Sequence, residues 1–108
     1  MNIFTRYLRK RAINKFIKRD LRIIQNIPAE QLVALLDTQQ KEGWEVRSVH
    51  PVNAIGHIKW QGKLCKGASA ITCRWDTQNQ GSMVGIARIV NPLGEAYGLH
   101  VDTQPRYD

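Results

Sequence analysis

The spacing of the apolar residues changes at Gly43, and this change limits the folds open to the chain. Before Gly43, apolar side chains recur every three or four residues, as on one face of a helix. After it, the segment 44–49 alternates apolar and polar side chains, as in a half-buried strand. A glycine just past the last helical turn can adopt the left-handed conformation that closes a helix. We therefore predict helices before Gly43 and strands after it.

A helix that ends at Gly43 has a recognisable beginning. Pro28 suits a first helical turn, and Glu30 is placed to complement the positive N-terminal end of the helix. The apolar face of this predicted helix consists of Ala29, Leu32, Leu35 and Leu36.

Turn-forming residues divide the remainder of the chain into further strands. The predicted strands are 56–60, 64–75 with a bend at Gly67, 83–90 and 96–102, and the predicted turns are 53–56, 61–62, 76–82 and 91–94. Two helices followed by such strands predict an α+β fold, in which two N-terminal helices pack on one face of a four- or five-stranded antiparallel sheet. A length of 108 residues suits one domain, divided into a basic helical segment (1–25) and a helix plus sheet (26–108).

The net charge of +7 lies entirely in the first 25 residues. These residues hold eight basic side chains and one acid, Asp20, whereas residues 26–108 hold eight of each sign. A charge concentrated in one segment indicates where a polyanion would dock.

The order of these charges predicts an amphipathic helix over about residues 9–25. At about 100° per residue, five cations share one stripe: Arg11, Lys15, Lys18, Arg19 and Arg22. The opposite face is apolar and consists of Ala12, Ile13, Phe16, Ile17, Leu21, Ile23 and Ile24. Phe4, Tyr7 and Leu8 would project beside the cations, so we expect a kink near residues 8–10. Alternatively, these three side chains contact a partner or a twin subunit.

A stripe of this kind favours an anionic partner over a merely solvated surface. We predict a non-catalytic nucleic-acid-binding protein that contacts the phosphates of RNA or DNA. The predicted binding residues are Arg11, Lys15, Lys18, Arg19 and Arg22, together with Arg6, Arg9 and Lys10. The first alternative is a protein-interaction module with an acidic partner, such as a phage- or plasmid-encoded inhibitor of a host complex. Another is a membrane-surface anchor.

Catalysis is a further alternative, because helices before an antiparallel sheet resemble the layout of barnase-like and RelE-like ribonuclease toxins. Such enzymes need a proton acceptor, a donor and a cation around one phosphate. Residues of these types are His57, Lys59, Arg74, Tyr97, His100 and Arg106, with His50 as a third histidine. Their spacing does not bring them together, so we expect the histidines to be ordinary surface residues.

The three tryptophans, Trp44, Trp60 and Trp75, could form a platform for base stacking. We expect them instead to be core residues, because each ends an alternating apolar pattern. The two cysteines, Cys65 and Cys73, predict neither a disulfide nor a metal site and suit a reducing cytoplasm. We find no cofactor or catalytic motif, and no apolar run that approaches the roughly 18 residues of a membrane span.

One local resemblance accompanies these patterns. The stretch LLDTQQKEGWEVRSV, residues 35–49, resembles the junction of helix, Glu-Gly-Trp and strand in small bacterial domains of unknown function. The resemblance implies a helix-to-strand junction at this position and implies no activity.

Overall fold

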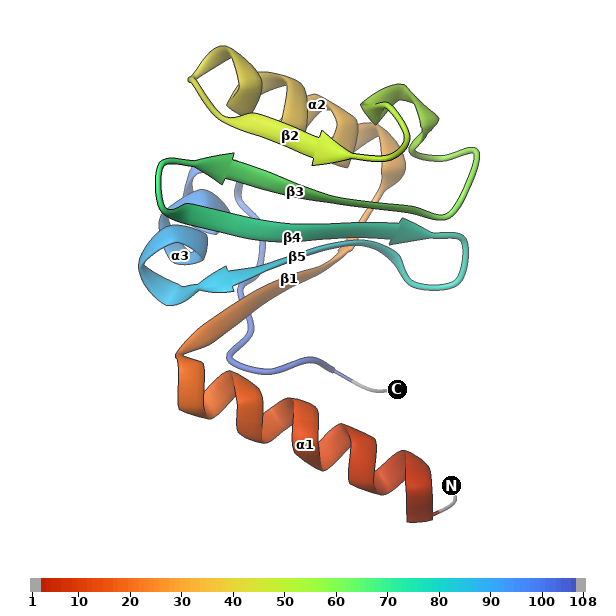
Figure 1. Ribbon diagram of the computed structural model, residues 1–108, viewed down its shortest axis with the longest axis vertical. Helices are drawn as coiled ribbons and strands as arrows, with labels where there is room; N and C mark the ends of the chain where they lie inside the picture. The colour runs from red at the N-terminus through yellow and green to blue at the C-terminus, as the bar shows by residue number, and fades with distance from the viewer. Residues whose placement is uncertain (1–2, 107–108) are drawn as a thin grey trace.

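The centre of the molecule is a five-stranded antiparallel sheet (Figure 1). It is seen in a computed structural model, which describes residues 3–106 except for the side chain of Phe4. The strands are β1 (Leu21–Ile27), β2 (Glu45–Ser48), β3 (Trp60–Lys66), β4 (Ser69–Asp76) and β5 (Gln80–Ile86). They lie in the order β1-β5-β4-β3-β2, and all neighbours are antiparallel. The predicted α+β class and antiparallel sheet are confirmed.

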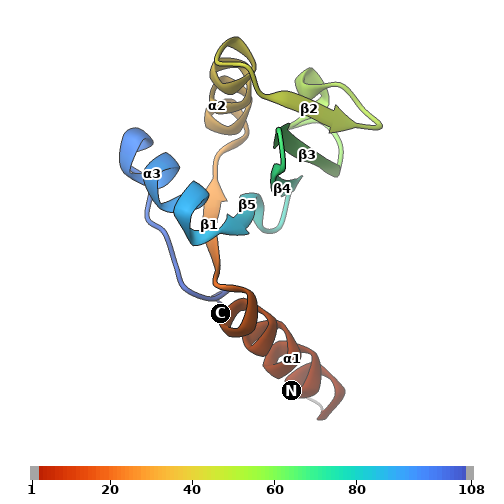
Figure 2. The same ribbon diagram turned by 60° about the vertical axis from the view of Figure 1, so that its left-hand side comes forward.

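Within residues 3–106, three helices flank the sheet, together with a short 3-10 turn, η1 (Val52–Ala54). They are α1 (Ile3–Arg19), α2 (Ala29–Lys41) and α3 (Ala87–Tyr97). Figure 2 shows α2 and α3 on the same side of the sheet, whereas α1 extends away from the other side. The prediction of two N-terminal helices on one face is therefore wrong, because the second helix on that face is the C-terminal α3.

The core lies between the sheet and the pair α2 and α3. Alternate strand residues such as Leu64, Cys73 and Met83 point into it, and the register places Trp60 opposite Trp75. From α2, Leu32, Leu35 and Leu36 complete the core at 1% exposure or less. In the part of the chain that the structure describes, no helix covers the opposite face of the sheet over β3 and β4, where outward side chains such as Lys63 and Arg74 are exposed (Figure 2).

The predicted helix over 9–25 is wrong beyond Arg19, since residues 21–27 form a strand. Asp20 separates the two elements at φ 53°, which ends α1. Its carbonyl oxygen accepts a hydrogen bond of 3.0 Å from the backbone N–H of Ala87, the first residue of α3. Ile23 and Ile24 lie on opposite faces of β1 and both are buried, because α1 and the C-terminal segment cover one face and the core covers the other.

The second helix forms as predicted. Pro28 is its N-cap, and Gly43 follows its C-terminal turn at φ 98°, in the left-handed region. The backbone N–H of Trp44 then donates to the carbonyl of Gln39, which leads the chain directly into β2.

The strand boundaries after β2 differ from the prediction. The region 64–75 belongs to two strands joined by a turn at Gly67, and the expected turn at 61–62 lies inside β3. The region 56–59 precedes β3 instead of forming a strand. The strands expected over 83–90 and 96–102 are replaced by β5, α3 and an irregular tail, even though α3 contains Pro92 and Gly94.

Candidate nucleic-acid interface

The basic residues of α1 are largely exposed, because the helix projects from the body. Arg6, Lys10, Arg11, Lys15, Lys18 and Arg19 are exposed, whereas Arg9 is half-buried. The helix contains no acid over its 17 residues. Within residues 3–106, none of the six exposed cations forms an ion pair. No ion pair within the described residues therefore offsets the repulsion among these six cations.

Arg22 does not belong to this stripe. It lies on β1, where its guanidinium contacts the carboxylate of Asp20 at 3.0 Å and donates to the carbonyl of Leu21 at 2.9 Å. Only 24% of its side chain is exposed. The predicted stripe of five cations is thus a stripe of four, formed by Arg11, Lys15, Lys18 and Arg19.

One narrow side of α1 packs on the sheet. Phe16 is buried, and Ala12 and Ile13 are half-buried beside it. The prediction that Ile17 faces the core is wrong, because its side chain is 71% exposed. The chain ahead of Ala12 continues as one helix from Ile3, so the predicted kink is wrong.

The apolar residues at the outer end of α1 are exposed as well. Ile3, Tyr7 and Leu8 join Ile17 among the exposed large hydrophobic side chains. The side chain of Phe4, which the sequence groups with Tyr7 and Leu8, lies outside the described part of the structure. A contact of this end with a partner remains a prediction.

A groove of about 720 Å³ lies between α1, the C-terminal segment and the uncovered face of the sheet. Its apolar part is next to α1 and includes Phe16, Leu21, Ile23 and Val84. Its polar part includes hydroxyls of β4 and β5, side-chain amides of β1 and side-chain amides around the β4–β5 turn: Thr72, Ser82, Gln25, Asn26, Gln78, Asn79 and Gln80.

Three cations from three separate parts of the chain line this groove: Lys15 from α1, Arg74 from β4 and Arg106 from the C-terminal segment. One acid, Asp76, lies with them. The N–H groups of Asn79 and Gln78 donate to Asp76 Oδ1 at 2.7 and 2.9 Å. Hydrogen bonding by Asn79, above all from its backbone, holds the pKa of Asp76 below its ordinary value, so the carboxylate stays charged.

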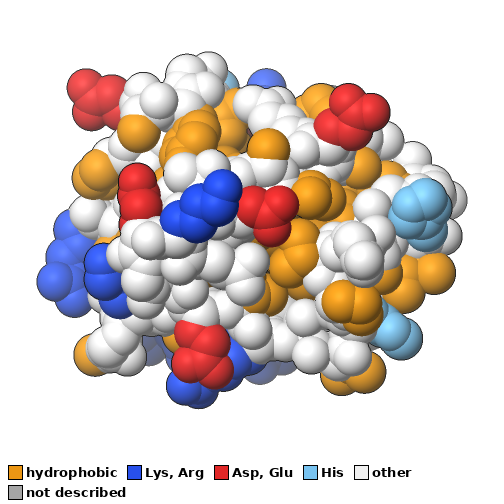
Figure 3. Space-filling view, turned by 90° about the horizontal axis from the view of Figure 1, so that it is seen from above, with side chains coloured by type: hydrophobic (Ala, Val, Ile, Leu, Met, Phe, Trp, Pro, Cys, Tyr) orange, Lys and Arg blue, Asp and Glu red, His pale blue; other side chains and the backbone are white. Residues whose placement is uncertain are grey.

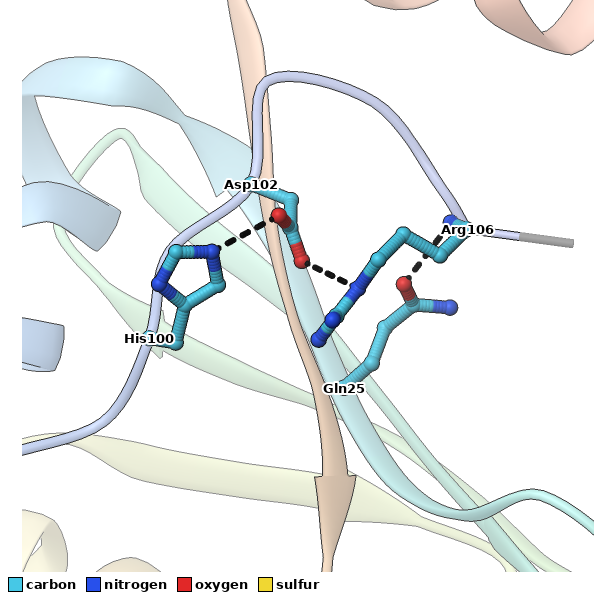
Figure 4. A network of polar contacts seen from close by, with 4 residues as sticks. All are labelled: Gln25, His100, Asp102 and Arg106. Atoms are coloured by element: carbon cyan, nitrogen blue, oxygen red, sulfur yellow. Dashed lines mark hydrogen bonds and ion pairs between the residues drawn. The ribbon is translucent and has the colours of Figure 1, made fainter. Parts of the chain in front are cut away.

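The C-terminal segment is fastened to β1 and forms one wall of the groove (Figure 4). Asp102 has a partner on each side: its Oδ1 is hydrogen-bonded to His100 Nε2 at 2.9 Å, and its Oδ2 forms an ion pair with Arg106 Nε at 3.0 Å. The backbone N–H of Arg106 donates to Gln25 Oε1 at 2.9 Å. These contacts hold the Arg106 guanidinium near the mouth of the groove.

The end of the molecule farthest from α1 has a mixed surface. Figure 3 shows this end, where acidic and basic side chains are interspersed with apolar patches. On α2 the exposed charged residues are Glu30, Asp37, Lys41 and the adjoining Glu42. The excess of positive charge is therefore concentrated on α1, as the sequence predicted.

The residues considered for catalysis are not brought together. His57 precedes β3, while His100 contacts Asp102, which pairs with the edge strand β1, so the strands β1, β5 and β4 lie between the two histidines. Tyr97 lies on the other side of the sheet, where it accepts a hydrogen bond of 2.8 Å from the buried Gln39. Arg74 and Arg106 line the same groove, and His100 is linked to Arg106 through Asp102, which contacts both.

The tryptophans are core residues in two cases of three. Trp60 and Trp75 are buried at 1% and 5% exposure, and Trp60 donates from Nε1 to the carbonyl of His50. Trp44 is half-buried, with the Lys66 ammonium 6.0 Å from its ring centroid. The uncovered sheet face therefore has no tryptophan platform in the described chain.

Cys65 and Cys73 lie on opposite faces of the sheet, because they occupy alternate positions of the β3–β4 register. Burial raises the pKa of the Cys73 thiol to about 12. A metal-binding cluster of His, Cys, Asp and Glu does not occur among residues 3–106.

Sequence reasoning missed the groove, although it named two of its cations for another role. The available signal was the polar alternation of β4, where Thr72, Arg74 and Asp76 share the face opposite Ile71 and Cys73. That pattern indicates a sheet face that no helix covers, but it does not predict that α1 and the C-terminal segment lie beside that face.

The described residues include no helix with the length and apolar character required to cross a membrane. Comparisons with family models, curated proteins and solved structures gave no match.

Proposed function

We propose that this protein binds RNA or DNA without catalysis, through phosphate contacts of the cations on α1. The observation that carries the proposal is the projection of six exposed, unpaired cations on a helix without acids. A solvated surface helix usually carries charged side chains of both signs, whereas this helix carries only positive ones.

The physical reason is the release of counterions. A helix of 17 residues is about 25 Å long, so its cations can reach several successive phosphates. Each phosphate that a cation neutralises releases condensed counterions, which favours binding most strongly at low salt. The same phosphate contacts carry no sequence information, and we accordingly expect weak sequence preference.

Binding to fluorescein-labelled RNA and DNA oligonucleotides at several salt concentrations tests the proposal. For contacts with four or five phosphates, the logarithm of the association constant should fall with the logarithm of salt at a slope of roughly −3 to −4.5. Changing Arg11, Lys15, Lys18 and Arg19 together to Gln should remove most of this slope. The fold should persist, because all four side chains are exposed.

A matched control changes four exposed cations of the body to Gln: Lys41, Lys59, Lys63 and Arg88. This variant loses the same charge, so any difference between the two variants reports position rather than net charge. Equal losses in both variants, or a flat salt response of the wild type, would contradict the proposal.

A protein partner with an acidic surface is the second candidate, favoured by the exposed apolar side chains on α1. Phosphate binding has no use for Ile3, Tyr7, Leu8 and Ile17 on the same helix as the cations. Apolar contacts of this kind commonly provide the binding energy of protein interfaces. Tyr7→Ala and Ile17→Ala should leave oligonucleotide binding within about twofold of wild type if these side chains serve a protein partner; a larger loss would show that they contact nucleic acid instead.

The proposal excludes ribonuclease activity, and the separation of His57 from His100 supports this. Incubation with single-stranded, double-stranded and transfer RNA should give binding without cleavage. A general acid and base together supply several powers of ten in rate, so a true ribonuclease would cleave visibly at low enzyme concentration. Cleavage that His57→Ala or His100→Ala abolishes without loss of binding would reverse this conclusion.

A further inference from the structure

The groove beside α1 combines an apolar surface with positive charge, and a nucleic-acid strand carries a matching part for each. Leu21 and Val84, which are half-buried, form most of its apolar floor next to the helix, since Phe16 and Ile23 are only 7% and 6% exposed. Lys15 and Arg74, which form no ion pair within residues 3–106, give it positive charge, and Arg106, which is ion-paired with Asp102, lies at a third point around that floor. Flat apolar faces of bases suit the former surface, and phosphates suit the latter.

We infer that this groove binds single-stranded nucleic acid in preference to duplex, an inference that rests on the proposed phosphate binding by α1. In a duplex the bases are stacked and paired inside, so only its backbone could meet the rim of the groove. An unpaired strand can turn its bases toward the floor while its phosphates remain on the cations.

The polar residues of the groove agree with a strand rather than a bare anion. Thr72 and Ser82 offer hydroxyls on the sheet, and Gln25 lies beside them at the β1 edge. Asp76 stays ionised among these groups, and it would repel an isolated phosphate at close range. A carboxylate of this kind can accept hydrogen bonds from the amino groups of bases.

Arg74 is the residue that separates this inference from binding by α1 alone. It is exposed on β4, and within residues 3–106 it makes no hydrogen bond or ion pair. Its cross-strand neighbours are Gln61 on β3 and Ser82 on β5, so it stands on the sheet and not on the helix. A duplex held along α1 would have little contact with it.

The experiment compares a labelled mixed-sequence strand of about 12 nucleotides with its duplex, within the range of site sizes known for such grooves. Arg74→Gln should weaken binding of the strand by about five- to tenfold and reduce its salt slope by about 0.7, while binding of the duplex changes by less than about twofold. Lys63→Gln is the matched control, since Lys63 is an exposed cation on the adjacent strand of the same face and does not line the groove. It should change both affinities by less than about twofold.

A second measurement does not depend on any variant. Titration of the wild type with the strand should shift the amide resonances of Thr72, Ser82 and Val84 in an NMR spectrum. Shifts confined to α1, or equal effects of Arg74→Gln on strand and duplex, would overturn the groove as the binding site.

The two proposals fail in different ways. If the fourfold α1 variant loses binding while Arg74→Gln binds like wild type, the groove inference is wrong and the proposed function stands. If the wild type binds neither strand nor duplex with salt dependence, the proposed function is wrong and the groove inference falls with it.

Discussion

Ile23 and Asp102 exchange both of their backbone hydrogen bonds, with N···O distances of 3.0 and 2.8 Å. The C-terminal segment thereby pairs with β1 at the edge of the sheet. Such pairing satisfies backbone groups that an open edge would leave available to another chain. It also fixes the wall of the groove that Arg106 lines.

The side chain of Asp102 strengthens this attachment, which gives the first prediction. Its side chain is only 15% exposed and contacts both His100 and Arg106. We expect Asp102→Asn to destabilise the protein by about 0.5 to 1.5 kcal/mol and to speed hydrogen exchange at the amide of Ile23. Glu45→Gln, which breaks the exposed ion pair with Arg47, is the control and should cost less than about 0.5 kcal/mol in a denaturant melt. Equal costs would show that the tail adds nothing through Asp102.

Adjacent residues of α1 should respond very differently to truncation. Phe16 is 7% exposed against the sheet, and Ile17 is 71% exposed. Phe16→Ala should reduce the free energy of unfolding by about 2 to 4 kcal/mol because it leaves a cavity, whereas Ile17→Ala should change it by less than about 0.5 kcal/mol. Melts at several protein concentrations would also detect a twin subunit, since a loss at Ile17 that depends on concentration would place that residue in an interface.

The two cysteines should differ in reactivity. Burial, followed by the neighbouring Cys65, raises the pKa of Cys73 from 9.0 to about 12, so the thiolate is absent at neutral pH. Native protein should therefore react with a thiol reagent at Cys65 alone, and Cys73 should react only in denaturant. Cys65→Ser should abolish native labelling, and rapid labelling of that variant would contradict the burial of Cys73.

The same shift has a consequence for stability at high pH. Below the unfolded value near 9 the thiol is protonated in both states, so its contribution does not depend on pH. Between about 9 and 12 the unfolded chain ionises first, so stability should fall by up to about 1.4 kcal/mol per pH unit through this group. Cys73→Val should make that decline shallower, and an identical slope in both proteins would show that Cys73 does not titrate as described.

Gly94 should not tolerate a side chain, although it lies inside α3 where alanine is the better helix former. A Cβ atom there would overlap Cγ2 of Val101 and would lie 3.0 Å from the carbonyl oxygen of Leu99, because the tail folds back across the helix. We expect Gly94→Ala to destabilise the protein by about 1 to 3 kcal/mol, as other overpacking changes do. Ala96→Ser, on the exposed side of the same helix, is the control and should change the melting temperature little.

The sequence predicted best those elements that are determined by nearby residues. α2 has its proline at the start, its leucines on one face and Gly43 at the end, and all of these act within a few residues. β1 is the opposite case. Its residues 21, 23, 24 and 27 suit a helical face as well as a strand, and only pairing with β5, some 60 residues later, decides between them.

α3 shows a second limit of local reasoning. Asn91, Pro92 and Gly94 favour a turn, and Pro92 removes one backbone donor from the helix. Burial of Val90 and packing of Leu93 and Tyr97 against the core outweigh this cost. The same limit applies to the candidate site. The cations of α1 could be predicted from the first 25 residues alone, whereas the groove forms only where β4, α1 and the C-terminal segment come together.

The junction at Asp20 determines how α1 can move. One residue, Asp20, joins α1 to β1, and its carbonyl oxygen accepts a hydrogen bond from the backbone N–H of Ala87 in α3. A linker of several flexible residues would let α1 take many orientations relative to the sheet in solution. Here the connection is a single residue and Phe16 is buried against the sheet, so a change in tilt must expose Phe16, and α1 should tumble together with the sheet.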